Sequence, residues 1–426
     1  MRKVNKKIGN IFKGDKVIWM VFFFLCMISI IEVFSASSNL TYKSQNYMAP
    51  IIYHTAMILA GVIVAVVTLN VPCRYFKLTT PFLLAISVLT LVWVLIGGES
   101  INGANRVISI MGFTFQPSEI AKGTMVLVTA QILSAMQREN GADRKAFKYI
   151  LGILLPFVFI IGIENLSTAA LLFLVILLMM FIGRVPMRQM AQLMGGIVVA
   201  GAVILTLVLT LGSMENNPDD ENHMTETVAA ADAKTADKDA IKGGGLFHRF
   251  ATWRNRLTKH FGNEEVPPEE YDIEENFQVG HANIAIVSSN IIGKGPGNST
   301  ERDYLPQAFS DFIYAIIIED MGILGAIVVA FLYIVLLYRS ARIATRCENN
   351  FPAFLIMGLT LLLVIQATFN MMVAVGLAPV TGQPLPLISK GGTSTIINCA
   401  YIGAILSVSR SAKMKKEDKD IRSIEI

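Results

Sequence analysis

The sequence is poor in cysteine and in charged residues. Its 426 residues include four cysteines and five histidines, and Asp, Glu, Lys and Arg together make up 16%. Cys26 and Cys399 fall in apolar runs, and Cys73 and Cys347 fall in short basic loops, so we expect no structural disulfide. No spacing of histidine and cysteine typical of a metal site occurs. The composition therefore predicts neither a disulfide scaffold nor a dedicated metal centre.

Long apolar runs make up much of the chain instead. Hydrophobic residues account for 53% of it and its mean hydropathy is +0.55, which excludes an ordinary soluble domain. Many of the runs approach the roughly 20 residues that a helix needs to cross a bilayer. We therefore expect an all-α polytopic membrane protein with about ten transmembrane helices. Their approximate positions are 17–36, 50–71, 79–97, 119–136, 149–163, 167–183, 190–212, 312–338, 352–374 and 392–410.

Lysine and arginine gather in the two tails and in alternate short loops. The first apolar run lacks a small-residue cleavage site, so we expect it to be retained as a helix. The positive-inside rule then makes both termini cytoplasmic. The net charge of +4 reflects this bias and not binding to nucleic acid. The predicted parts are a basic tail (1–16), seven transmembrane helices (17–212), a large extracytoplasmic loop (213–311), three more transmembrane helices (312–410) and a second basic tail (411–426).

The large loop contains one amphipathic segment, residues 246–261. Its apolar side chains recur at helical spacing, and basic side chains lie between them. Such a helix suits the membrane interface, with its apolar face in lipid and its cations near phosphates. A helix packed on the protein's own membrane domain explains the same pattern, and both interpretations stay open. The apolar residues are Leu246, Phe250, Trp253, Leu257 and Phe261.

Asp311 ends the large loop and precedes an apolar run. A carboxylate there would lie near the membrane surface and be partly desolvated. Ionisable groups at membrane depth are costly, so Asp311 is a candidate functional residue. The alternative is that it caps the helix that follows, since aspartate favours helix starts.

Glu119 and Lys122 form a second candidate pair, in the segment FQPSEIAK that begins at Phe115. Pro117 suits the first position of a helix, and Glu119 then complements the helix dipole in the first turn. Capping does not explain Lys122, which lies on the same face three residues later. We therefore expect a buried ion pair that faces a polar cavity.

Two further outer segments are rich in glycine and proline. Residues 379–394 read PVTGQPLPLISKGGTS, which at membrane depth implies broken or re-entrant backbone surrounded by protein or by a water-filled cavity. Residues 293–299 read GKGPGNS, whose spacing is not that of a Walker loop. Its glycines either form a plain turn or expose backbone N–H groups to an anion.

Together these segments closely resemble the SEDS family, whose members include FtsW, RodA and SpoVE. The resemblance covers residues 17–410 and implies a peptidoglycan glycosyltransferase that polymerises lipid II, with a class B penicillin-binding protein as crosslinking partner. The charged tails and the large loop favour an FtsW-like member, which implies septal wall synthesis alongside other divisome membrane proteins. The matching motifs are NGAxR, FQPSExAK, STA, GKGPGNS, YLPxAxSDFIxA and PVTGxPLPLISxGGTS.

The resemblance also assigns site residues. In family members the aspartate of the DFI segment is required for polymerisation, and that residue is Asp311 here. The residues implied to bind substrate are Arg106, Gln116, Glu119, Lys122, Ser389, Lys390, Gly391 and Gly392. The chain departs from the family pattern at Val107, Asn165, Gln307 and Lys390.

The reaction expected from this resemblance is one displacement with inversion at the donor sugar. Asp311 would act as general base or orient the acceptor hydroxyl. Arg106, Lys122 and Lys390 would contact the pyrophosphate of the lipid-linked donor. The sequence indicates no dedicated metal site, and a role for Mg²⁺ or Mn²⁺ with Asp311 as a ligand stays open.

Three other functions fit parts of the pattern. A lipid II flippase would need polar groups along its whole path, and Glu319 and Asp320 lie deeper than the rest. Most polar residues cluster at the outer ends of the spans, which favours chemistry on the outer face of the bacterial cytoplasmic (inner) membrane. A scaffold without activity would not need Asp311. An elongation-type, RodA-like polymerase shares the PVTG string.

Overall fold

The computed structural model describes residues 13–36, 49–97, 99–101, 104–110, 113–139, 141–211, 277–305 and 308–424. The predicted interfacial helix at 246–261 lies outside these residues. The chain falls into two compact units, one made of residues up to Met187 and from Asp272 onward, the other of Arg188–Tyr271. Helix α9 (Met187–Leu211) belongs almost wholly to the second unit. The first unit contains the candidate site.

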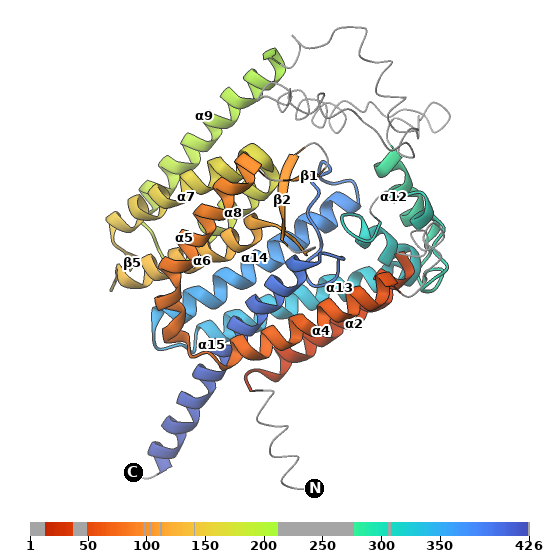
Figure 1. Ribbon diagram of the computed structural model, residues 1–426. Helices are drawn as coiled ribbons and strands as arrows, with labels where there is room; N and C mark the ends of the chain where they lie inside the picture. Colours follow the sequence, from red (N-terminus) through yellow and green to blue (C-terminus); the bar gives the residue numbers. More distant parts are fainter. Residues whose placement is uncertain are drawn as a thin grey trace. The chain divides into compact units, whose positions relative to one another are not determined.

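The first unit is built from helices, as the apolar runs predict (Figure 1). Those of the N-terminal half are α2 (Lys16–Ala36), α4 (Ala49–Asn70), α5 (Cys73–Gly97), α6 (Pro117–Ala135), α7 (Arg144–Glu164) and α8 (Leu166–Ile182). Those of the C-terminal half are α12 (Phe277–Ser288), the short 3₁₀ helix η2 (Glu301–Asp303), α13 (Ile313–Ala344), α14 (Asn350–Ala374) and α15 (Thr393–Ile424).

Within the described residues, six helices are long and apolar enough to cross a membrane: α2, α4, α5, α7, α13 and α14. Helix α8 is apolar but has 17 residues. Helices α6, α9 and α15 cover the other predicted spans without meeting the same criterion. The all-α membrane fold is confirmed, and ten remains the predicted number of spans.

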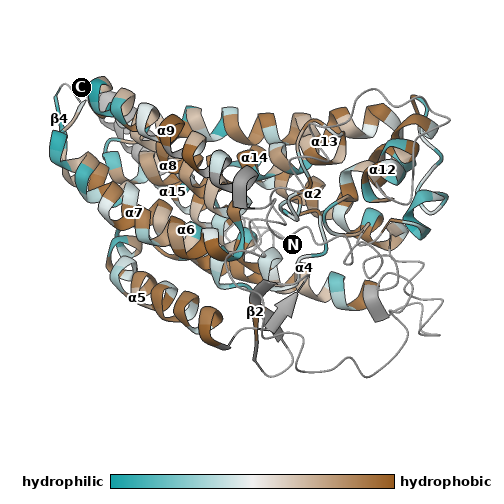
Figure 2. Ribbon diagram, turned by 90° about the horizontal axis from the view of Figure 1, so that it is seen from above, coloured by the Kyte–Doolittle hydropathy of each residue, from teal (hydrophilic) through white to brown (hydrophobic). Residues whose placement is uncertain are grey.

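Apolar residues cover the outer surfaces of the long helices. Figure 2 shows them along α5 and α13. On α13, side chains from Ile323 to Tyr338 are 49–60% exposed at seven positions, a pattern that suits contact with lipid tails. They are Ile323, Leu324, Ile327, Val328, Phe331, Ile334 and Tyr338.

Two small antiparallel sheets add to the all-α prediction. Strands β1 (Glu99–Ile101), β2 (Ala104–Ile110) and β3 (Phe113–Phe115) pair in that order, with Ser109 opposite Thr114. This sheet leads directly into α6. Strands β4 (Gln137–Arg138) and β5 (Gly141–Ala142) pair between α6 and α7. The strands of two and three residues escaped the sequence prediction because they are too brief to show an alternating pattern.

Helix α14 lies at the centre of the first unit, against α6, α8, α13 and α15 (Figure 1). The most extensive helix pair is α4 with α15. A Cβ on Gly403 of α15 would lie 2.5 Å from the carbonyl oxygen of Ala65 on α4. Glycine therefore allows these two backbones to approach closely, as small residues do between membrane helices.

Helix α13 is broken at Gly322, where φ is 69° and ψ is −172°. The hydroxyl of Tyr314 donates a 3.2 Å hydrogen bond to the carbonyl of Ala326. In a continuous helix these residues would be roughly 18 Å apart along the axis. The chain therefore reverses sharply, and 313–321 forms a short helix of its own. This divides the predicted span 312–338.

Steric crowding explains why glycine occupies the break in α13. A Cβ on Gly322 would lie 2.2 Å from the carbonyl oxygen of Ile291, so the backbone that follows α12 occupies the break. The positive φ is also one that glycine adopts at little cost. Irregular backbone at membrane depth needs surrounding protein, and the glycine-rich segment supplies it.

Candidate active site

Asn370 of α14 joins the two segments that the sequence singles out. Its side-chain amide donates to the carbonyl of Asp311 at 2.8 Å and to the carbonyl of Gln383 at 2.7 Å. Asn370 is 1% exposed. One buried amide therefore fixes the start of α13 and the α14–α15 loop (residues 375–392) relative to each other.

The α14–α15 loop contacts the chain just before Asp311 at two more points. The Ser389 hydroxyl donates to the carbonyl of Ser310 at 2.6 Å, and the N–H of Lys390 donates to the carbonyl of Phe309 at 2.9 Å. The structure thus brings Ser389 and Lys390 to the segment that carries Asp311, although 78 positions separate Ser389 from Asp311 in the sequence.

Lys390 contributes a half-buried cation to this region. Its Nζ lies 4.8 Å from the centre of the Phe309 ring, over the ring face. Burial lowers the pKa of Lys390 from its ordinary value. An ammonium that has lost part of its water shell is a stronger electrostatic partner for an anion than a fully hydrated one.

Asp311 itself is partly exposed, and its Oδ1 accepts a 3.0 Å hydrogen bond from the Ser310 hydroxyl. The N-cap of α13 is Phe312, without a side-chain capping bond. Asp311 therefore lies one residue before the capping position. The carboxyl group belongs to the turn that precedes the short helix 313–321.

The buried ion pair of Glu119 and Lys122 is confirmed, while the polar cavity beside it stays a prediction. The Lys122 Nζ lies 2.7 Å from the Glu119 Oε1, and the two side chains are 0% and 2% exposed. Lys122 also donates to the Oε1 of Gln366 at 2.7 Å, and Gln366 donates to the carbonyl of Pro384 at 3.0 Å. The pair therefore links α6 through α14 to the α14–α15 loop. With no exposed surface, Lys122 does not contact a ligand in this conformation.

Helices α15 and α8 also hold this framework. The Tyr401 hydroxyl donates to the carbonyl of Glu119 at 2.5 Å. The Gln383 amide donates to the Thr168 hydroxyl at 2.7 Å. Asn165, one of the departures from the family pattern, accepts the N–H of Thr168 at 3.2 Å and so caps α8. The STA segment thus supports the loop from the α8 side.

The remaining predicted residues lie on other elements. Arg106 lies on β2, and Gln116 is the N-cap of α6 without a side-chain capping bond. Gly391 and Gly392 form the turn into α15, where their carbonyls accept the N–H groups of Ser394 and Thr395. Gln307 lies outside the described residues.

Sequence reasoning missed Gln366 and Asn370. Both lie inside an apolar helix, four residues apart and therefore on one face. Two buried amides at this spacing in a membrane span are a signal that could have identified them, because such polar groups need partners.

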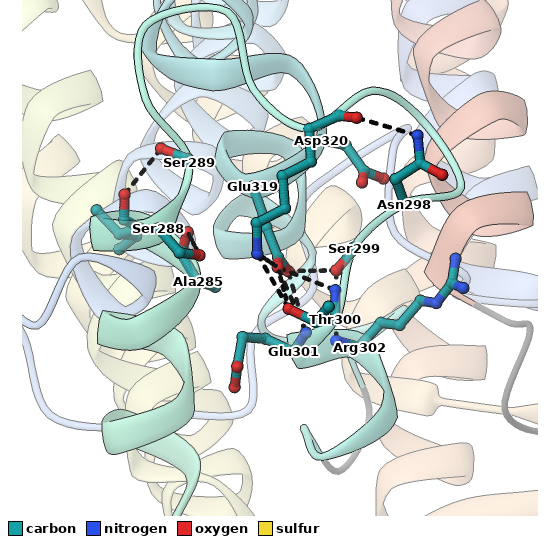
Figure 3. Close-up of polar contacts among 12 residues, drawn as sticks. Ala285, Ser288, Ser289, Asn298, Ser299, Thr300, Glu301, Arg302, Glu319 and Asp320 are labelled. Atoms are coloured by element: carbon teal, nitrogen blue, oxygen red, sulfur yellow. Dashed lines mark hydrogen bonds and ion pairs between the residues drawn. The ribbon is translucent and has the colours of Figure 1, made fainter.

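The glycine-rich segment 293–299 encloses a carboxylate of the chain itself (Figure 3). Glu319 is fully buried and accepts from the Lys294 ammonium at 2.6 Å, from the Thr300 N–H at 3.0 Å and from the Ser299 hydroxyl. The N–H groups of Lys294 and Gly295 bond to the carbonyls of Glu319 and Asp320. Glu319 therefore has a structural role within the bundle. This role weakens the argument that Glu319 belongs to the polar path of a flippase.

This fold and site define a polytopic helical membrane protein whose polar groups converge where the α14–α15 loop meets the start of α13. The chain belongs to the FtsW/RodA/SpoVE family, because the model of that family, described as a cell cycle protein, matches residues 15–218 and 240–414. The family inferred from the motifs is thereby confirmed.

Individual relatives agree with this membership. A probable peptidoglycan glycosyltransferase FtsW from Coxiella burnetii is 26% identical over 403 residues, which cover 92% of this chain and 95% of the relative. Two solved structures share the fold. One, at TM-score 0.66 and 22% identity, covers 94% of this chain and 98% of its own, and is described as structural coordination of polymerization and crosslinking by a peptidoglycan synthase complex. The rod shape determining protein RodA of Thermus thermophilus gives TM-score 0.59 at 19% identity, with coverage of 94% and 98%.

Proposed function

We propose that this protein is a peptidoglycan glycosyltransferase that polymerises lipid II on the outer face of the bacterial cytoplasmic membrane, during septal wall synthesis. The observation that carries the proposal is the hydrogen-bonded frame around Asp311. Asn370, Ser389 and Lys390 fix the backbone of residues 309–311, while the Asp311 side chain stays partly exposed. Family membership and the names of the relatives support the same activity.

The proposed step forms one bond and breaks one bond. The 4-hydroxyl of the acceptor GlcNAc attacks the anomeric carbon of the donor MurNAc, whose bond to undecaprenyl diphosphate breaks. Inversion at that carbon converts the α-linked donor into a β-linked product. Asp311 accepts the proton of the attacking hydroxyl, and the undecaprenyl diphosphate leaves with its electron pair.

Of the two predicted cations whose side chains the structure describes, Lys122 and Lys390, the partly exposed Lys390 is the better placed to stabilise the departing diphosphate. Its backbone is bonded to Phe309, two residues before Asp311, and its ammonium is half-buried. A positioned charge in a partly dry site stabilises developing negative charge more than it would in water. Lys122 and Glu119 instead position the α14–α15 loop, since both are buried and bonded within the bundle.

A divalent cation, Mg²⁺ or Mn²⁺, could share this task only with oxygens from the substrate. Within the described residues, no three His, Cys, Asp or Glu side chains gather as a metal site. Asp311 would then be a single protein ligand. Polymerisation measured after chelation and after adding back each ion separates this arrangement from a role for Lys390 alone.

We also propose that a class B penicillin-binding protein and other divisome membrane proteins bind this chain. The solved structure whose title couples polymerization with crosslinking in one complex supports this partnership. Depletion of the protein in its host should produce filaments if its role is septal, whereas rounded cells would indicate elongation.

The proposal is tested with purified protein and purified lipid II in detergent and in liposomes, with and without the class B partner. Glycan strands are the expected product. No strands under either condition, together with rapid lipid II scrambling in the same liposomes, would overturn the proposal in favour of a flippase. If the protein produced no strands and did not scramble lipid II, the scaffold role would be favoured instead.

A further inference from the structure

Glu32 is a buried carboxyl group of helix α2. It is 0% exposed, and neither Oε1 nor Oε2 has a hydrogen-bonding partner among the described residues. Its neighbours along the helix are apolar, apart from Ser29 and Ser35 on the same face. The polymerisation step uses neither Glu32 nor any group bonded to it.

Glu32 faces the break in α13. Ser35 lies three residues after Glu32, and residues at this spacing are neighbours on one helix face. The Ser35 hydroxyl donates to Oδ2 of Asp320, just before Gly322, and accepts the N–H of Gly297 at 3.0 Å. Glu32 and Ser35 therefore share the face of α2 that Asp320 contacts. Asp320 is 1% exposed, and its Oδ1 has no partner.

The charges around this point do not balance. Three carboxyl groups are present, those of Glu32, Glu319 and Asp320. Glu319 pairs with Lys294 at 2.6 Å (Figure 3). The second cation near these groups is Arg302, whose Nε lies 3.6 Å from Oδ1 of Asp303. No cation within the described residues is paired with Glu32.

In the part of the chain that the structure describes, the other elements against α2 supply no further cation there. The Arg302 guanidinium is already bonded to the carbonyls of Ser35 and Gly297, at 3.1 Å and 2.8 Å. From α4, His54 contacts Ser29 at 2.8 Å, one turn before Glu32. From η2, Glu301 is paired with His281 and Asp303 with Arg302, at 2.6 Å and 3.6 Å. Among the described residues, two cations, Lys294 and Arg302, face three buried carboxyl groups, so at least one positive charge is missing there.

We propose that Glu32 and Asp320 share one proton, so that Glu32 is a neutral carboxylic acid at neutral pH and donates to the Oδ1 of Asp320. An ionised carboxyl buried without a partner is so costly that such groups neutralise instead. One proton would account for the missing charge and would give both the unpaired Oδ1 and one oxygen of Glu32 a partner.

A metal ion fits this site less well than a proton. Calcium takes six to eight oxygen ligands, and magnesium requires an octahedral set. The cluster offers three unpaired carboxyl oxygens, and the described part of the chain has no group of three His, Cys, Asp or Glu side chains able to hold a metal. The bound proton would instead allow α2, the segment 294–302 and the break at Gly322 to pack without net repulsion.

Two measurements on the full-length protein test this assignment, with Glu32→Gln as the main variant and Glu319→Gln as matched control. The first is thermal unfolding in detergent from neutral to alkaline pH. A folded state that holds the proton more tightly than the unfolded state loses stability as pH rises. The unfolding temperature of the wild type should therefore fall relative to that of Glu32→Gln as pH rises. Glu319→Gln should be less stable than wild type already at neutral pH, because its ion pair with Lys294 is lost.

The second measurement is infrared difference spectroscopy with isotope-labelled glutamate. The wild type should show a carboxylic acid C=O band that is absent from Glu32→Gln and shifted in Asp320→Asn, where the hydrogen-bond partner changes. An unchanged spectrum in Glu32→Gln would overturn the assignment. So would a wild type that gains stability over Glu32→Gln when Na⁺, Mg²⁺ or Mn²⁺ is added, since the cluster would then hold a metal ion. If Glu32→Gln does not fold, the Asp320→Asn spectrum decides by itself: an unshifted carboxylic acid band there would overturn the assignment.

Discussion

The side-chain amide of Asn370 is bonded to the carbonyl of Asp311, at 2.8 Å, and the same nitrogen also bonds to the carbonyl of Gln383. A residue in the middle of an apolar helix thus sets the position of the proposed general base. The two carbonyls belong to segments that the sequence separates by the whole of α13 and α14.

Asn370→Ala should therefore weaken both folding and polymerisation. A buried carbonyl left without its donor costs about 1–3 kcal/mol, and two carbonyls lose their donor here. We expect a lower unfolding temperature and a larger loss in the rate of strand synthesis than in lipid II binding. Thr368→Ala, an exposed position on the same helix, is the control and should leave both unchanged. Equal activity of Asn370→Ala and wild type would contradict this role of Asn370.

The buried pair of Glu119 and Lys122 predicts strong non-additivity. Removing one partner of a buried ion pair costs about 3–5 kcal/mol, because the other charge stays buried and unpaired. Lys122→Met and Glu119→Gln should each lower stability, and the double variant should be more stable than the sum of the two losses implies. Thermal unfolding of the four proteins measures this coupling. Additive losses would mean that the two side chains act independently.

The close contact between α4 and α15 predicts that Gly403→Ala is destabilising. Its Cβ would lie 2.5 Å from the carbonyl oxygen of Ala65, and overpacking of this kind costs about 1–3 kcal/mol. Gly152→Ala is the matched control, because a Cβ there meets nothing within 4 Å. In a helix interior that change should raise stability by roughly 0.5–1 kcal/mol. A comparison of the unfolding temperatures of the two variants tests this packing. If Gly403→Ala were as stable as the wild type, α4 and α15 would have to lie further apart than in the structure.

Asp15 predicts a loss of stability at acidic pH. Burial acts to raise the pKa of this carboxyl, but hydrogen bonds from Arg339, at 2.9 and 2.7 Å, and from backbone N–H groups lower it below the ordinary value of 3.8. A lowered folded-state pKa stabilises the fold above the ordinary value, and this stabilisation is lost as pH falls through the folded pKa. The difference in unfolding temperature between wild type and Asp15→Asn should therefore shrink towards low pH. If the difference in unfolding temperature grew on acidification, the pKa of Asp15 would be raised in the folded state. That result would contradict the stabilising contact between Asp15 and Arg339.

The sequence predicts best where a local rule applies. The spacing of Glu119 and Lys122 on one helix face led directly to their ion pair, and the density of proline and glycine in 379–394 indicated irregular backbone next to protein. Both predictions rest on neighbours along the chain.

Contacts between distant segments were beyond such rules. The run from Ile313 to Ala344 reads as one span because every residue around Gly322 except the preceding acids is apolar or small. The break depends on the backbone of Ile291 filling it. For the same reason the partners of Gln366 and Glu319 could not be named, since their donors and acceptors come from other helices.

The most direct test of the account is strand synthesis by Asp311→Asn, with Asp303→Asn as control, from purified lipid II in the presence of the class B partner. Asp303 is an exposed acid of the same outer segment and plays no part in the proposed chemistry. Because general-base action contributes roughly 10²–10⁴-fold, Asp311→Asn should fold normally and lose strand synthesis by about that factor, while Asp303→Asn stays active. Near-normal polymerisation by Asp311→Asn would contradict the central claim that this carboxyl group performs the chemistry.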